Sequence, residues 1–351
     1  MRPNDLIRGL IALGVLVAVV GVIQRASESD VVYGFWYPRK SIRPAAPFTN
    51  GNHVAGWLVM TLSVSVGYLC GAVSRRARRT PAWRRRLLWI GSSAVNEILL
   101  VTMAIGVMAV GVVVTLSRSR IISLVVALAG AGLWANRHHA GRRQRFLIPI
   151  ALALVLVVAV GRGGLDRVGQ EFERASWNDV GRRIPIWRDT TTIIRDFPAT
   201  GTGLNTSGIA MLAYQKDIAD TRAVEAHNDY LQLAAEGGLL LGIPFLRLGW
   251  VVTREIRHRF TEEADAHDAQ TYWQRVGAVT GLGAIALQET VDFSLQMPGN
   301  AALFAVLLAI AMHRPRCRED EAPQRAEGRV SHSPEAMSRR HAGLALGRAE
   351  T

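Results

Sequence analysis

The chain has 351 residues, of which 49% are hydrophobic and 20% charged, and it carries a formal net charge of +13. The hydrophobic share is high for a soluble protein, and the basic residues gather in short segments between apolar runs. This pattern excludes a nucleic-acid-binding protein, which needs a basic stripe on a soluble domain, and it predicts a membrane protein.

Eight apolar runs could form membrane-spanning helices, since one crossing needs about 20 residues. They cover residues 6–23, 54–73, 98–116, 121–135, 146–160, 239–252, 276–291 and 301–312. The runs 239–252 and 301–312 are short, and each needs flanking residues to complete a crossing. The first run follows a basic start, so a cleaved signal peptide is the alternative there. We expect an all-α polytopic protein with about eight transmembrane helices.

The connections between the runs predict the orientation, because short cytoplasmic loops carry an excess of Lys and Arg. Segments 75–86, 137–145 and 253–260 are rich in arginine and are expected inside. Both termini then lie in the cytoplasm, and residues 161–237 form a large outer loop. That loop holds nine basic and eleven acidic residues, and its net charge of −2 fits the outer side.

The chain therefore divides into four parts. Residues 1–160 hold five helices, 161–237 form the outer loop, 238–312 hold three helices, and 313–351 form a charged, disordered cytoplasmic tail. Cys70 and Cys317 fall on different sides of the membrane, so no disulfide is expected. No Cys/His cluster has the spacing of zinc ligands, and we expect neither a metal nor a cofactor.

Taken in chain order, the first polar string is Pro47–Trp57, which presses Asn50, Asn52 and His53 against the start of an apolar run. Polar groups at that depth need partners. We expect these three residues to contact a substrate or, alternatively, to cap the following helix.

The next string, Ser-Arg-Ser-Arg at 117–120, lies between two runs on the outer side. Arg118 and Arg120 could hold a phosphate, for which the guanidinium fork is well shaped. The alternative is that they snorkel to lipid phosphates at the membrane boundary.

The outer loop carries three arginines, Arg182, Arg183 and Arg188, close in sequence to Trp187. Arg183 and Trp187 are one helical turn apart, a spacing that fits either amphipathic packing or an arginine braced by an aromatic ring in a pocket. All three arginines are candidate site residues. The following Gly201 and Gly203 are a weak phosphate-loop signal, since no Lys-Ser/Thr follows them.

The string from Glu225 to Gly238 contains the candidate base, His227. Read as a helix, Asn228, Gln232 and Glu236 share one face, and Gly237-Gly238 ends it. His227 would lie in or beside the first turn, where the helix dipole favours a neutral imidazole that can act as a general base. Asn228 and Gln232 are then expected at the substrate. The alternative is that His227 caps or packs a surface helix.

The last string, 290–300, places Asp292 between the final two runs. Asp292 is a candidate partner for one of the arginines and a candidate substrate contact. It could equally be an exposed helix cap.

Together these strings resemble the O-antigen ligase and polymerase family of bacterial membrane proteins. The resemblance rests on F-T-N-G-N-H-V-A-G-W-L at 48–58, S-R-S-R at 117–120, the R-x3-W and P-x2-G-x-G block at 183–203, and H-N-D-Y-L-Q-L-A-A-E-G-G-L-L-L-G at 227–242. The string D-F-S-L-Q-M-P-G-N at 292–300 closes the set. The order of these separated motifs is more specific than any one of them.

The resemblance implies a polytopic helical glycosyltransferase at the inner membrane, with the large loop in the periplasm. Such enzymes move a glycan from a polyprenyl-pyrophosphate carrier to an acceptor hydroxyl, on a glycan or a lipid, without a metal. It further implies roles for Arg118 or Arg120, for Arg183 and for His227.

Two alternatives to an active enzyme stay open. Relatives usually have several spans ahead of the 48–58 string, whereas this chain has one, so it could be an inactive, truncated member. A second alternative is a small-anion transporter whose arginines bind the anion between spans.

Overall fold

The computed structural model describes residues 3–27, 31, 48, 50–77, 93–114, 122–126, 128–129, 181, 183–216, 223–266 and 269–314. Within these ranges the regular elements are helices, as predicted for an all-α protein, and none is a strand. The elements are α1 (Pro3–Ala26), α2 (Gly51–Ala77), α4 (Ser93–Val114), α8 (Ser207–Tyr214), α9 (Asp229–Ala266), α10 (Ala269–Gln288), the short η2 (Ser294–Gln296) and α11 (Pro298–Met312). A further helix covers 183–196.

Four helices in the described ranges are long and apolar enough to cross a membrane: Pro3–Gln24, Gly51–Arg75, Val95–Val114 and Asp229–Thr261. They match the predicted runs 6–23, 54–73, 98–116 and 239–252. The runs 276–291 and 301–312 correspond to α10 and to the shorter apolar α11. Most of the run 121–135, all of 146–160 and the tail from 315 lie outside the described residues, so the total of eight remains a prediction.

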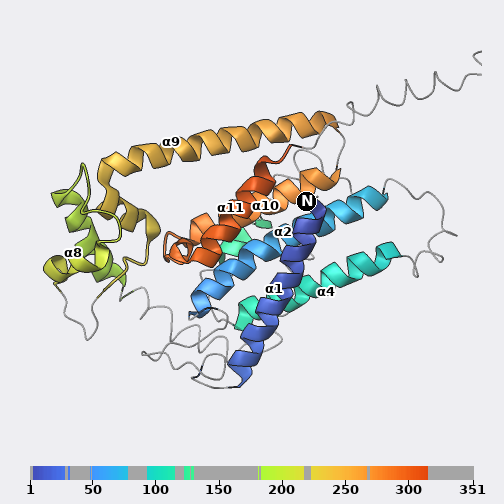
Figure 1. Cartoon of the computed structure of the whole chain (residues 1–351), viewed down its shortest axis with the longest axis horizontal. Coiled ribbons are helices and arrows are strands. Elements are labelled where there is room, and N and C mark those ends of the chain that lie inside the picture. The colour runs from blue at the N-terminus through green and yellow to red at the C-terminus, as the bar shows by residue number, and fades with distance from the viewer. Residues whose placement is uncertain are drawn as a thin grey trace, which may run out of the picture. The chain divides into compact units, whose positions relative to one another are not determined.

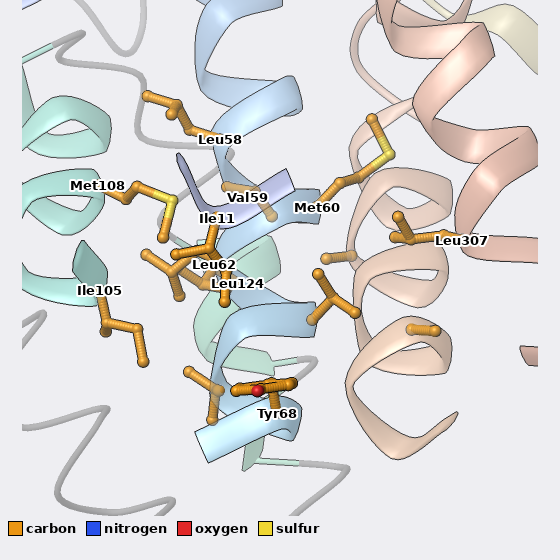
Figure 2. Packing of buried hydrophobic residues seen from close by; sticks show 14 of the residues in the cluster. Ile11, Leu58, Val59, Met60, Leu62, Tyr68, Ile105, Met108, Leu124 and Leu307 are labelled. Atoms are coloured by element: carbon orange, nitrogen blue, oxygen red, sulfur yellow. The ribbon is translucent and has the colours of Figure 1, made fainter. Parts of the chain in front are cut away.

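Helix α2 lies at the centre of the bundle and contacts α1, α4, α10 and α11 (Figure 1). Nearly all of its apolar length is buried, which fits a helix surrounded by other helices. Figure 2 shows Leu58, Met60 and Leu62 of α2 between Met108 of α4 and Leu307 of α11. The core is therefore built around the span that follows the Pro47–Trp57 string.

The α2–α10 contact depends on two pairs of glycines, each four residues apart. Gly67 on α2 faces Trp273 and Gly277 on α10, Gly71 faces Gln270, and Gly281, four residues after Gly277, faces the Met60 backbone of α2. A Cβ at Gly67 would lie 2.8 Å from the Gly277 Cα, and one at Gly277 would lie 2.7 Å from the Ser63 carbonyl oxygen. Such small-residue faces let helix backbones approach closely, and here they hold α10 antiparallel against α2.

Helix α9 is broken at Gly238, whose backbone is not helical (φ 52°, ψ −155°). A short first part carries the polar residues predicted to share a face, and a long second part carries exposed apolar residues. These include Leu239, Leu240, Ile243, Leu246 and Trp250. Gly238 therefore ends one helix as predicted, but a second, apolar helix begins directly after it, in the stretch that is long and apolar enough to cross a membrane.

Candidate functional site

The candidate site is formed where the start of α9 meets the connection between α10 and α11, residues 289–297. The backbone N–H of Asp229 donates to the carbonyl oxygens of Glu289, at 3.0 Å, and Asp292, at 3.2 Å. The Gln296 amide donates to the Asp229 carboxylate at 2.7 Å. These bonds fasten the strings 227–242 and 292–300 to each other.

His227 lies directly before the capping residue of α9, as the sequence predicted. Asn228 is that cap, because its side-chain oxygen accepts a hydrogen bond from the Leu231 N–H at 3.0 Å. His227 itself has φ 51°, in the left-handed region that is costly for a residue with a Cβ. Strained residues of this kind persist where the surrounding structure holds them, and they concentrate at functional sites.

The neighbouring residue Ala226 is held from two sides, and this fixes the backbone that presents His227. Its N–H donates to the Gln232 side-chain oxygen at 3.1 Å, and its carbonyl accepts from the Trp187 indole at 3.0 Å. The Gln232 amide also donates to Glu225 and Glu236. Gln232, a predicted substrate contact, therefore uses its amide to hold the His227 loop in this structure.

The glycines at 201 and 203 have a structural role at the α9 break. The backbone N–H groups of Gly201, Thr202 and Gly203 donate to the carbonyls of Phe197, Ala235 and Glu236. They are occupied by the protein, so the phosphate-loop interpretation is wrong. The physical reason is tertiary packing: the glycine segment 201–203 packs against the end of the first part of α9, and the carbonyls there accept its N–H groups.

The fit of these segments requires glycine at the point of closest approach. The N–H groups of Leu239 and Leu240 donate to Pro198 and Ala199 across the break. A Cβ at Gly238 would lie 2.6 Å from the Gly201 nitrogen, and both glycines have positive φ. The Glu236 carboxylate completes the contact by accepting the N–H of Asn205 at 2.8 Å and of Ser207 at 3.0 Å, at the start of α8.

Arg183 and Trp187 lie on one face of the helix 183–196 and contact the two halves of the site. The Arg183 guanidinium donates to the carbonyl of Val291, 2.5 Å away, in the α10–α11 connection. One turn later Trp187 contacts the His227 loop through Ala226. The R-x3-W spacing thus places Arg183 against the α10–α11 connection and Trp187 against the loop of the candidate base, and the interpretation of an arginine braced by the ring in a pocket stays a prediction.

Phe293 lies against two histidines from different parts of the chain. Its ring centroid is 5.0 Å from that of His227, with an interplanar angle of 71°, and 5.0 Å from that of His53, at 74°. His53 is only 3% exposed, and its Nδ1 is 3.2 Å from the Ser294 hydroxyl. The string 48–58 therefore reaches the site through a buried ring contact.

Asn50 takes the capping role that was the alternative to a substrate contact. Its side-chain oxygen accepts the Asn52 N–H at 2.8 Å, and its carbonyl accepts the His53 N–H at 3.0 Å. Asn52 is half-buried in the first turn of α2. Of the outer-loop arginines, Arg188 is exposed, while Arg118, Arg120 and Arg182 are not among the described residues.

Two carboxyl groups in the α10–α11 connection are buried. Asp292 is 2% exposed, so the prediction of an exposed cap is wrong. It is enclosed because the α9 start packs over it. Glu289 is 1% exposed, and burial, followed by the nearby Asp229 carboxyl, raises the pKa of Glu289 to about 9. Both causes favour the protonated, neutral form of Glu289 in a site expected to hold an anion.

Residues 103–246 match the family model described as O-antigen ligase. This segment is therefore similar to the O-antigen ligase family. The matched residues include Arg183, Trp187, His227 and the break at Gly238. No curated protein and no solved structure matches the chain. The family resemblance is thus confirmed over this segment of the chain.

Sequence reasoning missed three residues that shape the site: Phe293, Ser294 and Glu289. All three lie in the α10–α11 connection, and their contacts with His53, His227 and Asp229 join residues at least sixty positions apart. Phe293 stood in the string D-F-S-L-Q-M-P-G-N, where an aromatic residue in a polar turn was the available signal. For Glu289 the available signal was its place inside the predicted span 276–291, since ionisable residues in such spans are buried and partnered.

Proposed function

We propose that the chain transfers a glycan from undecaprenyl pyrophosphate to an acceptor hydroxyl on a lipid or a growing glycan, at the periplasmic face of the bacterial inner membrane. The observation that carries the proposal is the joining of Arg183 and His227 by one helix, 183–196, inside the segment that matches the O-antigen ligase family. One supplies a fixed positive charge and the other a basic nitrogen.

In the proposed reaction the acceptor oxygen attacks the anomeric carbon of the carrier-linked sugar. The new carbon–oxygen bond forms as the bond from that carbon to the pyrophosphate oxygen breaks, so the configuration inverts. His227 takes the proton of the acceptor hydroxyl, and the electron pair of the broken bond leaves with undecaprenyl pyrophosphate. A general base of this kind contributes about 10²–10⁴-fold.

Arg183 would stabilise the charge on the leaving pyrophosphate. A guanidinium has five N–H donors in a planar fork that matches phosphate oxygens, and here NH1 donates to Val291, which orients the group. By family resemblance, Arg118 or Arg120 would supply a second positive charge. Asn52, Arg182, Arg188, Asn228, Gln232 and Asp292 remain proposed substrate contacts.

The test uses the full chain in proteoliposomes. The donor is the lipid-linked glycan that accumulates in membranes of a strain lacking the gene, supplied together with a membrane extract as acceptor. Transfer of glycan with release of undecaprenyl pyrophosphate is expected. Anion flux through the same vesicles without transfer would support the transporter instead, and the absence of both would favour an inactive family member.

The size of the accumulated glycan distinguishes a ligase from a polymerase, the two activities within the family. Long polymer on the carrier indicates a lost ligase, whereas single repeat units indicate a lost polymerase. The same membranes therefore supply the substrate for the assay and the evidence for the reaction class.

A further inference from the structure

His53 is held in place by contacts on its backbone and its ring. Its N–H donates to Asn50, and its carbonyl accepts the Asn300 side-chain amide at 3.2 Å. Its Nδ1 lies 3.2 Å from the Ser294 hydroxyl, and the side chain is buried. A residue enclosed in this way cannot reach a substrate unless the start of α2 moves. The string 48–58 includes that start.

Ser294 is fixed just as firmly, and this fixes the residue before it. Its hydroxyl accepts the Gln288 amide at 3.0 Å, and its carbonyl accepts the Asn300 amide at 3.0 Å. Ser294 and Asn300 are fully buried. The backbone of Phe293 is therefore attached to α2, α10 and α11 through its neighbour.

The Phe293 ring makes edge contacts with both imidazoles, from His53 in α2 and from His227 before α9. Aromatic rings attract each other in this edge-to-face arrangement, so the orientation of one constrains the next. A shift of His53 would thus change the position of Phe293, and a shift of Phe293 would change the surface on which His227 lies.

We infer that His53 is a positioning residue that acts on His227 through Phe293, in place of the direct substrate contact expected from its sequence. The inference rests on the proposed function of His227 as the base. It assigns a role to the string 48–58, which lies outside the segment that matches the family model. General bases need accurate placement, since an error of about 1 Å can cost roughly 100-fold in rate.

The kinetic test uses His53→Asn, Phe293→Leu and the double variant in the proteoliposome assay. A positioning role predicts that His53→Asn lowers kcat by roughly 10- to 100-fold while the KM for the lipid-linked donor stays within about twofold. It also predicts that kcat of the double variant is close to kcat of Phe293→Leu alone, because the ring that connects His53 to His227 is absent from both. A raised KM, or effects that multiply in the double variant, would overturn the inference and restore the substrate contact.

A second readout does not depend on transfer activity. Histidine labelled with ¹⁵N gives ring signals in nanodiscs, and the signal of His227 among the nine histidines is assigned by its loss in His227→Gln. Both His53→Asn and Phe293→Leu should shift that signal, whereas His313→Asn, at the far end of α11, should not. An unchanged His227 signal in a folded His53→Asn protein would refute the coupling.

Two outcomes separate this inference from the proposed function. Wild-type protein that transfers no glycan but shows the coupled ring signals would refute the proposed function and leave the contact chain standing. Wild-type protein that transfers glycan, but whose His227 signal does not respond to His53→Asn or Phe293→Leu, would support the proposed function and refute the positioning role of His53. If His53→Asn does not fold, Ser294→Ala tests the same chain, because it removes the hydroxyl partner of His53 and keeps the imidazole.

Discussion

The two ends of the α10–α11 hairpin both contain buried polar groups, but they use them differently. At one end, which we call the Arg275 end, the fully buried Arg275 donates through Nε, NH1 and NH2 to the carbonyls of Ala311, Arg259 and His313. At the other, the His227 end, Arg183 donates through NH1 to a single carbonyl, that of Val291. One guanidinium joins three helices, while the other is oriented by one bond.

The Arg275 end also contains a cluster that joins three N-terminal helices. Arg8 of α1 donates to Tyr68 of α2 at 2.9 Å and to Glu97 of α4 at 2.6 Å, and Tyr68 donates to Glu97 at 2.5 Å. Opposite charges and hydrogen bonds satisfy one another there, as polar groups within a membrane protein require. These contacts have no backbone strain beside them.

A buried charge is therefore weak evidence of a functional site. Both ends bury ionisable groups, yet only the His227 end combines an arginine oriented by one bond, a histidine with positive φ and a neutral buried carboxyl. Substitutions at the Arg275 end should therefore change stability, and those at the His227 end should change the reaction. The predictions below test that division, starting with the largest effect.

Replacing His227 with Ala should abolish most transfer, by about 10²–10⁴-fold, because the acceptor proton would have no base. The KM for the donor should change little, and the wild-type rate should fall on acidification as the imidazole takes up a proton. Initial rates at several pH values measure both effects. His313→Ala, at the Arg275 end, is the matched control, and parental turnover by His227→Ala would return His227 to a structural role.

Replacing Arg275 with Gln should destabilise the fold by about 3–5 kcal/mol, because three carbonyls lose a charged donor in a buried place. Transfer per folded molecule should stay near the parental rate. Denaturant titration in detergent, paired with activity normalised to folded protein, measures the two separately. The exposed Arg254→Gln serves as the control. A stable variant with lost activity would show that the division between the ends is wrong.

Replacing Arg183 with Lys keeps the charge but removes the planar fork, and it should lower kcat/KM by roughly tenfold to 100-fold. That range corresponds to the loss of one or two charge-assisted hydrogen bonds to the leaving pyrophosphate. Rates for Arg195→Lys, an exposed arginine on the same helix, provide the comparison. Equal rates for the two variants would indicate that Arg183 only braces the α10–α11 connection.

Local features of the sequence predicted local features of the structure. The apolar runs predicted α1, α2, α4 and the second part of α9, because a run of about 20 apolar residues has few other structures available in a membrane. The position of His227 beside the first turn of a helix and the end of that helix at Gly238 followed from short-range periodicity and glycine signals, whereas the cap at Asn228 was not predicted. Each of these depends on residues within a few positions.

Contacts between distant residues were beyond such reasoning. His53 and Ser294 are 241 positions apart, and nothing in either string specifies the other. The glycines of the P-x2-G-x-G block were read as a weak phosphate signal because their partner, the broken helix at Gly238, is known only from the fold. One long-range contact did have a signal: the paired glycines at 67 and 71 and at 277 and 281 have the spacing of close helix packing.

The smallest expected effect concerns Glu289, and it appears as a change in pH dependence. Its pKa is raised from an ordinary 4.5 to about 9, chiefly by burial and then by Asp229. Asp292 adds to this rise, while the Leu295 N–H opposes it. Since the folded state binds the proton more tightly than the unfolded state, the resulting stability is fully present below pH 4.5 and is lost as the pH rises toward about 9.

Glu289→Gln removes this titration and keeps a neutral side chain of similar shape. Relative to the parent, the variant should therefore be more stable at pH 8 than at pH 5, and its transfer rate near pH 7 should stay close to the parental rate because the parent is already neutral there. Thermal unfolding at the two pH values measures the first effect, with the exposed Asp5→Asn as control. Parallel unfolding temperatures would mean that Glu289 is ionised in the fold, and a strong loss of transfer would mean that its carboxylate takes part in the reaction. Either result would give Glu289 a role in the reaction and not only in the stability of the His227 end. An ionised carboxylate beside the proposed pyrophosphate site would repel the anion, and the positive charge of Arg183 would have to balance it.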